Sequence, residues 1–180
     1  ASACVATTSS TDDGSDGNFY CVNGGNVGGT TGSCTCTSCN AGYSGNSCQT
    51  ASTCASTQVA NSNYASSNSI TGTTGQSVSV TCNAGYSGSG SATCQTSGAF
   101  TTVSCTASAC IATSLHTDDG SNGNFYCVNG GTIGGTTGSC TCSCAAGFSG
   151  SSCETADPCV STTVSSDDGS NGNFYCVNGG

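Results

Sequence analysis

Apolar residues are scattered singly along this chain, and nowhere do they recur with the 3.6-residue period of an amphipathic helix. The clearest pattern is an alternation in which serines separate Val78 from Val80, and it predicts a strand with one buried face. Elsewhere glycine and the β-branched residues threonine and valine dominate, which disfavours helix. We therefore predict small disulfide-rich all-β modules in tandem, with short strands, turns, irregular loops and almost no helix.

One stretch of sequence occurs three times with a single change. Residues 12–25 read Asp-Asp-Gly-Ser-Asp-Gly-Asn-Phe-Tyr-Cys-Val-Asn-Gly-Gly, and the copies at 118–131 and 167–180 replace only the third Asp with Asn. The opening Ala-Ser-Ala-Cys at 1–4 recurs at 107–110. Repetition of this kind is typical of a chain built from similar units. Because the chain starts and stops inside such copies, we expect it to be an internal piece of a longer, secreted protein.

Cysteine is the most informative part of the composition. The chain has 18 cysteines in 180 residues, a density typical of a disulfide scaffold in an oxidising, extracellular compartment. Zinc sites usually combine Cys-x-x-Cys pairs in twos, often with histidine. Here there is one such pair, Cys36 and Cys39, and one histidine. The composition therefore favours disulfides over bound metal.

Large apolar side chains are too few to build an ordinary core. Leu, Ile, Val and Phe make up roughly a tenth of the chain, against a usual floor of about 20% for a packed domain. Ordering a residue costs about 1–2 kcal/mol in conformational entropy, and this apolar surface cannot offset that cost. Disulfides, at about 2–4 kcal/mol each, are expected to supply the missing stability.

The charge balance excludes several partners. The chain has no lysine or arginine and a net charge of −9, so it has no cations to neutralise nucleic acid or an anionic membrane surface. No apolar run approaches the about 20 residues of a membrane-spanning helix. We predict no nucleic-acid binding and no direct membrane insertion.

Two six-cysteine units share a characteristic ending. Cys39 to Cys48 and Cys144 to Cys153 both follow the pattern Cys-x-x-Gly-aromatic-x-Gly-x-x-Cys, and both units carry Asn-Gly-Gly after their second cysteine. These motifs resemble epidermal growth factor-like (EGF-like) domains. The resemblance implies EGF-like modules at 1–53 and 107–158, with the pairs Cys39–Cys48 and Cys144–Cys153. It also implies the start of another such module at 159–180.

The motifs assign no partners to the remaining cysteines of these units. A Gly/Thr-rich insert at 26–32 and 132–137 precedes the third cysteine, where the family has none, and six cysteines allow 15 connectivities. The pairing therefore stays open for ten cysteines: Cys4, Cys21, Cys34, Cys36, Cys110, Cys127, Cys140, Cys142, Cys159 and Cys176.

A four-cysteine unit lies between the two. It contains the run Gly85-Tyr86-Ser87-Gly88 and has Phe100 near its last cysteine, where the family usually has tryptophan. The unit resembles a sushi (complement control) domain spanning 54–106. That resemblance implies the pairs Cys54–Cys94 and Cys82–Cys105.

The acidic repeat has two interpretations. Alternating Asp, Asn and Gly can supply oxygen ligands to calcium, which makes Asp12, Asp13, Asp118, Asp119, Asp167 and Asp168 candidate ligands. However, the spacing is not that of an EF-hand loop, and Asp16 becomes Asn122 in the second copy. Asp, Asn and Gly are also the residues that turns favour. We favour a plain turn and keep calcium as the alternative; no cofactor is required.

An aromatic pair precedes a cysteine in each copy of the repeat. In so apolar-poor a chain these rings are expected to be packing anchors or subunit contacts. They are Phe19, Tyr20, Phe125, Tyr126, Phe174 and Tyr175.

No set of residues suggests catalysis. His116 is the only histidine, and the matching position in the first copy is Ser10. Cys36 and Cys39 have redox-motif spacing, but without a helix to lower a thiol pKa they are expected to be structural. We predict that the chain is not an enzyme.

Hydroxyl residues are abundant, roughly a third of the chain, whereas no Asn-x-Ser/Thr sequon occurs. We therefore expect O-linked rather than N-linked sugars, at stretches such as 6–11, 113–117 and 161–166.

These features together suggest a mechanical role outside the cell. The mosaic of EGF-like and sushi-like units resembles the repetitive glycoproteins of protist surface appendages, such as the tubular flagellar hairs (mastigonemes) of stramenopile algae. That resemblance implies a rod-like subunit that self-associates into a homopolymer, with other glycoproteins as further partners. The alternative is a secreted or cell-surface adhesion protein, because both module types also occur in binding proteins.

Overall fold

The protein is described by a computed structural model, which covers residues 1–176. Within that part of the chain there is no helix, and the prediction of a small disulfide-rich all-β class is confirmed. Every sheet has two strands. The strands are β1 (Val5–Ala6), β2 (Asn18–Phe19), β3 (Asn26–Thr30), β4 (Ser33–Thr37), β5 (Tyr43–Ser44), β6 (Thr50–Ala51), β7 (Ser77–Val80), β8 (Tyr86–Ser87), β9 (Gly90–Thr93), β10 (Thr106–Ala107), β11 (Ile111–Thr113), β12 (Asn124–Tyr126), β13 (Thr132–Thr136), β14 (Ser139–Ser143), β15 (Phe148–Ser149), β16 (Thr155–Ala156), β17 (Val160–Thr162) and β18 (Asn173–Tyr175).

The chain forms two compact units. The first contains residues 1–81 and 89–104, and the second contains 82–88 and the chain from Cys105 onward. The division crosses the predicted sushi-like module, so the four module boundaries stay predictions. We call the predicted modules the first (1–53), second (54–106), third (107–158) and fourth (159–180) segments.

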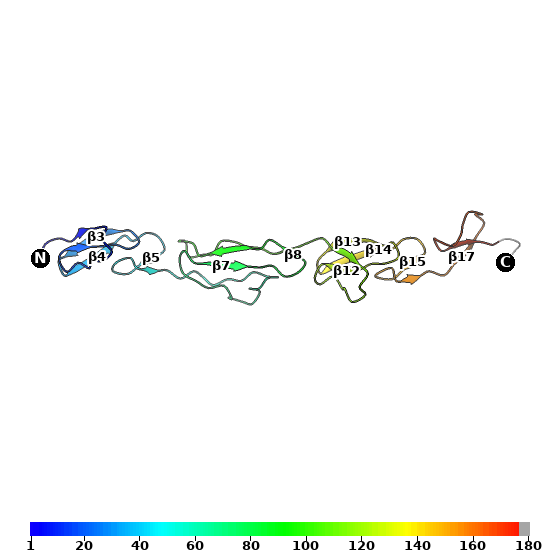
Figure 1. Cartoon of the computed structure of the whole chain (residues 1–180), viewed down its shortest axis with the longest axis horizontal. Helices are drawn as coiled ribbons and strands as arrows, with labels where there is room; N and C mark the ends of the chain where they lie inside the picture. Colours follow the sequence, from blue (N-terminus) through cyan, green and yellow to red (C-terminus); the bar gives the residue numbers. More distant parts are fainter. Residues whose placement is uncertain (177–180) are drawn as a thin grey trace. The chain divides into compact units, whose positions relative to one another are not determined.

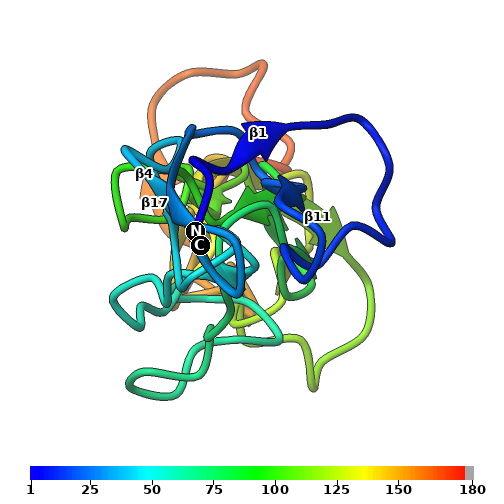
Figure 2. The same cartoon turned by 90° about the vertical axis from the view of Figure 1, so that its left-hand side faces the viewer.

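Hairpins built on glycine organise the first unit. β3 and β4 are antiparallel and lie side by side (Figure 1), joined by a turn at Thr31 and Gly32, whose φ of 82° suits glycine. The Gly/Thr-rich insert that leaves the third cysteine late therefore forms strand β3. β1 pairs in parallel with β2, and the loop between them projects from the strand in Figure 2.

Sulfur takes much of the place of a hydrophobic core in the first segment. Phe19, Cys36 and Cys48 are buried together, and Cys21, Val27, Cys34 and Cys39 pack against them. The part of the second segment in this unit has a more conventional core of Ile70, Val80 and Ala92, with Val59 beside it. The predicted strand at Val78 and Val80 is confirmed as β7, which is antiparallel to β9 and buries Val80 while Val78 is half-buried.

The second unit repeats this plan. β11 pairs in parallel with β12 as β1 does with β2, and the hairpin of β13 and β14 matches that of β3 and β4 (Figure 1). The parallel pair of β17 and β18 starts the plan once more in the fourth segment. None of the described elements is a helix long and apolar enough to span a membrane.

The short connections between segments are strands rather than free linkers. β6 pairs with β5, β10 with β8, and β16 with β15, always antiparallel. Each connection is thus tied to the last hairpin of the preceding segment.

Candidate functional sites: the aspartate loop and the segment joints

The acidic repeat forms the same backbone structure in all three copies. We call it the aspartate loop, at residues 12–20, 118–126 and 167–175. In the first copy Gly14 N donates to Asn18 O at 2.8 Å and Tyr20 N donates to Asp12 O at 3.2 Å. The corresponding bonds of the other two copies measure 2.8 Å for the glycine and 2.9 and 3.1 Å for the tyrosine. Nearly identical sequence therefore produces the same local backbone structure in different parts of the chain.

Carboxylates hold these loops through Asx turns. Asp13 Oδ1 accepts the Ser15 N–H at 2.9 Å, and Asp119 and Asp168 do the same with Ser121 and Ser170. The backbone bond from Ser15 holds the pKa of Asp13 below its ordinary value, and Asn18 does the same to the pKa of Asp16. For Asp119 and Asp168 the lowered pKa comes mainly from the side chains of Ser121 and Ser170, followed by their backbone N–H groups.

The first aspartates of the later copies accept hydrogen bonds from threonines five residues before them. Asp118 Oδ2 accepts the Thr113 hydroxyl at 2.6 Å, and Asp167 Oδ2 accepts that of Thr162. These bonds are those of a turn. Among residues 1–176, no group of three or more His, Cys, Asp or Glu side chains is placed to hold a metal ion. Calcium binding at Asp12 and its counterparts stays a prediction that these contacts do not test.

The aromatic pair behaves differently in each copy. Phe19 is buried, with 6% of its surface exposed, whereas Phe125 is half-buried and Phe174 is 49% exposed. Gly14 lies close to both Phe19 and Cys34, and Gly120 lies close to both Phe125 and Cys140. The absence of a side chain on the loop glycine therefore lets the aromatic ring and the disulfide approach each other. The fourth segment has no such disulfide among the described residues, and its ring, that of Phe174, is exposed to solvent. Tyr20, Tyr126 and Tyr175 are half-buried.

Eight disulfides are present in the described chain. The four pairs that the motifs implied are among them: Cys39–Cys48, Cys144–Cys153, Cys54–Cys94 and Cys82–Cys105. The pairs left open are Cys4–Cys34, Cys21–Cys36, Cys110–Cys140 and Cys127–Cys142. The order in both six-cysteine segments is thus first to third, second to fourth and fifth to sixth. Cys159 and Cys176 are unbonded and exposed in the described chain.

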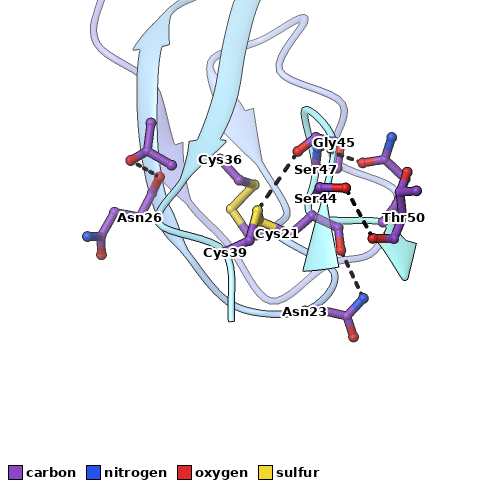
Figure 3. The surroundings of a disulfide bond; sticks show 12 residues. Cys21, Asn23, Asn26, Cys36, Cys39, Ser44, Gly45, Ser47 and Thr50 are labelled. Atoms are coloured by element: carbon purple, nitrogen blue, oxygen red, sulfur yellow. Dashed lines mark hydrogen bonds between the residues drawn. A yellow bond between two sulfur atoms is a disulfide. The ribbon is translucent and has the colours of Figure 1, made fainter. Parts of the chain in front are cut away.

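The last two disulfides of each six-cysteine segment lie against one another. Figure 3 shows the Cys21–Cys36 bond beside the hairpin at Ser44 and Thr50, where Asn23 Nδ2 donates to the Cys48 carbonyl at 2.9 Å. Asn129 makes the same bond to Cys153 at 2.8 Å. The Asn-Gly-Gly motif therefore ties the second cysteine to the last. Cys36 and Cys39 bond to other partners, as their structural interpretation requires.

A contact that sequence inspection missed recurs at the segment joints. The glycine before each hairpin aromatic accepts a backbone hydrogen bond from the connection that follows its hairpin: Ser52 N donates to Gly42 O and Ser108 N to Gly85 O, both at 2.8 Å, and Asp157 N to Gly147 O at 2.9 Å. In the first two joints a threonine completes the contact. Thr74 N and Oγ1 donate to Ser52 O at 2.9 and 3.2 Å, and Thr137 makes bonds of the same lengths to Ser108 O.

These joints are packed too closely to admit a side chain on the glycine. A β-carbon on Gly42 would lie 2.7 Å from Thr74 Oγ1, and one on Gly85 would lie 2.6 Å from the Asn122 backbone. On Gly147 it would lie 2.9 Å from the backbone of Asn171. The signal was present in the sequence as Ala-Gly-aromatic-Ser-Gly on one side and Thr-Thr-Gly on the other, at residues 30–32, 73–75 and 136–138.

A hollow lies in the second segment. It measures about 280 Å³ and is lined by both apolar and hydroxyl side chains, including Ile70, Ala92, Phe100 and Thr101. His116, the single histidine, is exposed in the third segment.

No protein-family model matches this chain, and no curated protein matches it either. The EGF-like and sushi-like resemblances therefore rest on motifs and cysteine order alone.

Proposed function

We propose that this chain is a structural subunit of an extracellular filament or surface appendage, stapled by disulfides, O-glycosylated and self-associating. One observation carries the proposal: the exposed surface repeats along the chain. The first residue of each parallel pair is apolar and open, with Val5, Ile111 and Val160 exposed by 60%, 64% and 60%. Single exposed apolar residues are ordinary, but the same one at the same place in three segments offers repeated contact points to other copies.

The crosslinking supports a mechanical role. Eight disulfides among 176 described residues are typical of proteins outside the cell, where a small core must persist without repair. Two of these pairs, Cys39–Cys48 and Cys144–Cys153, are the ones that the EGF-like resemblance implies. In tandem modules that pass load along the chain, joints without free linkers resist bending better than flexible ones.

Sugars would sit where hydroxyls already face solvent. Thr8, Ser9, Ser10 and Thr11 are exposed on the loop that follows β1. Thr117, and the stretch containing Ser165 and Ser166, are exposed at the corresponding places of the later copies. Because the chain has no basic and few acidic residues, O-linked glycans at these sites would keep its surface hydrated.

Assembly tests the proposal directly. Secreted wild-type protein should form filaments under the electron microscope, and a variant carrying Val5→Asp, Ile111→Asp and Val160→Asp should fold but fail to form them. A matched control places aspartate at Asn46, Thr102 and Ser151, which are exposed and lie outside the stretches proposed for sugars, and should still assemble. Wild-type protein that stays monomeric at high concentration would exclude the filament role, as would full assembly of the apolar-to-Asp variant.

Adhesion is the second candidate, favoured by the hollow at Phe100, which offers both apolar and hydroxyl side chains to a partner. If the chain binds a partner there, Phe100→Ser should abolish attachment to target cells while leaving any filament intact. Unchanged attachment would remove this candidate.

A further inference from the structure

The receiving side of the joint occurs once without a partner. Ser2, Gly17 and Thr31 of the first segment correspond in sequence to Ser108, Gly123 and Thr137 of the third. We call these three residues the N-terminal face. Within residues 1–176, no Gly-aromatic turn lies against it, whereas its counterpart in the third segment holds the turn at Gly85.

The N-terminal face already has the geometry of an occupied joint. Thr31 N and Oγ1 donate to Ser2 O at 2.9 and 3.2 Å, the same lengths as the bonds of Thr137 to Ser108 and of Thr74 to Ser52. A β-carbon on Gly17 would lie 3.1 Å from Thr31 Oγ1, as one on Gly123 would from Thr137 Oγ1. Binding a turn there would require no rearrangement of these groups, which keeps the entropic cost low.

The N-terminal face differs from its counterpart in the third segment in one respect: among the described residues, only the counterpart has a glycine carbonyl bound to it. In the third segment, Ser108 N donates to Gly85 O at 2.8 Å and Thr137 Oγ1 lies 2.6 Å from the same oxygen. Thr137 is consequently buried, at 5% exposure, whereas Thr31 is half-exposed and Ser2 is exposed. Ser2 N–H has no acceptor among the described residues, and a carbonyl at this point would satisfy it.

We propose that the N-terminal face binds the Gly-Tyr-Ser-Gly turn of a module of the 54–106 type, through the carbonyl of the turn glycine. The third segment shows this pairing, and the residues around the contact agree: Ala-Ser-Ala-Cys enters both receiving segments, at 1–4 and 107–110. A second copy of the chain is a poorer occupant. Its turns at Gly42, Gly85 and Gly147 are all engaged with their own next segments. The proposal does not depend on filament formation.

A chain with one added module tests the proposal. A second copy of residues 54–106 is placed directly before Ala1 of the full chain, which recreates the native Thr-Ala-Ser-Ala-Cys junction. Amide exchange of Ser2 is then measured by NMR, with Ser108 as the internal standard for an occupied joint. We expect Ser2 to exchange at least about tenfold more slowly than in the same extended chain with Gly85→Val in the added copy. Equal rates in the two chains would overturn the proposal.

Two further measurements keep the result interpretable if the valine variant misfolds. Thr31 is half-exposed in the original chain, so Thr31→Val should leave the first segment folded. In the extended chain it should lose severalfold of the Ser2 protection; unchanged protection would contradict the assigned contact. The original 180-residue chain should show the same state of association with and without Thr31→Val, because the N-terminal face takes no part in contacts between copies. A dimer that Thr31→Val dissociates would show that a second copy is the occupant, and the proposal would then be wrong.

Discussion

At the scale of single residues, glycines set the shape of the hairpins, and neighbouring ones do so for different reasons. Gly29 in β3 has a φ of 88°, and a β-carbon there would overlap the carbonyl oxygen of Ser33. Gly32 in the following turn has a similar φ of 82° but open space around it. Gly28 has neither constraint. Within one hairpin, Gly32 is required by its backbone angle alone, whereas Gly29 is required by both its backbone angle and the lack of space for a side chain.

Three alanine substitutions measure this difference. Gly28→Ala should leave the free energy of unfolding nearly unchanged, and Gly32→Ala should lower it by about 1–2 kcal/mol through left-handed strain alone. Gly29→Ala should lower it further, because the strand backbone must move away from the new methyl group. Guanidinium unfolding of the oxidised chain would measure the order, and equal losses for Gly29→Ala and Gly32→Ala would contradict it.

The Asx turns should also depend on pH. Because the folded pKa of Asp16 lies below its ordinary value of 3.8, this carboxylate stabilises its turn fully above that pH and loses the effect as pH falls through the folded pKa. Asn122 and Asn171 make the same bond to the residue two positions on, at 2.9 and 3.0 Å, without a titrating group. Asp16→Asn should therefore keep the loop and remove the loss of protection, relative to the intrinsic exchange rate, that the Asn18 amide otherwise shows at acid pH. A persisting acid transition at Asn18 would refute this.

At the scale of elements, no strand pair is stable alone, because an isolated two-stranded hairpin is marginal in water. The structure compensates by placing disulfides beside its hairpins. Cys4–Cys34 connects the first strand region to β4, and Cys39–Cys48 closes the hairpin that carries the turn glycine. The disulfides differ in the length of chain that they close, from 9 residues at Cys39–Cys48 to 40 at Cys54–Cys94.

Replacing both cysteines of a pair with alanine should cost more where the closed loop is longer. Chain-entropy arithmetic gives about 4 kcal/mol for Cys54–Cys94 and about 2.6 kcal/mol for Cys39–Cys48. Burial acts in the same direction, since Cys54 and Cys94 are both buried whereas Cys39 is only half-buried. Denaturant unfolding followed by near-ultraviolet tyrosine signals would measure both losses. A larger loss for the short loop would show that native packing outweighs loop entropy.

At the scale of the whole molecule, covalent bonds replace a continuous core. The largest fully buried side chains are Ile70, Val80, Cys48, Cys94 and Cys153, so three of the five are half-cystines. Buried apolar surface is correspondingly small, and no lysine or arginine is available for an ion pair with the acidic residues. Stability should therefore follow the oxidation state more closely than temperature or salt.

Complete reduction should unfold the protein. We expect the β-type circular dichroism of the oxidised chain to be lost in strong reductant at neutral pH, and to return on reoxidation if the native pairs reform. Alkylation and peptide mapping at the midpoint would show which pairs open first. A reduced chain that keeps its spectrum would mean that hydrogen bonds and the few apolar contacts suffice.

Much of this architecture was readable in the sequence. The all-β class follows from glycine, threonine and valine without helical periodicity, and local motifs of a few residues specified the aspartate loop and the Cys39–Cys48 pair. Val78 and Val80 identified β7 by alternation alone. These features are local, so neighbouring residues determine them almost regardless of what else the chain does.

Tertiary structure decided what depends on distant residues. The partners of Cys4 and Cys21 could not be chosen until the Gly/Thr-rich insert folded as β3 and placed Cys34 and Cys36 on the opposite strand. The joints likewise bring Gly85 to Thr137 across 52 positions, through one carbonyl and a threonine that look ordinary in the sequence. Short motifs constrain local turns, whereas pairing and docking depend on which surfaces meet after those turns have formed.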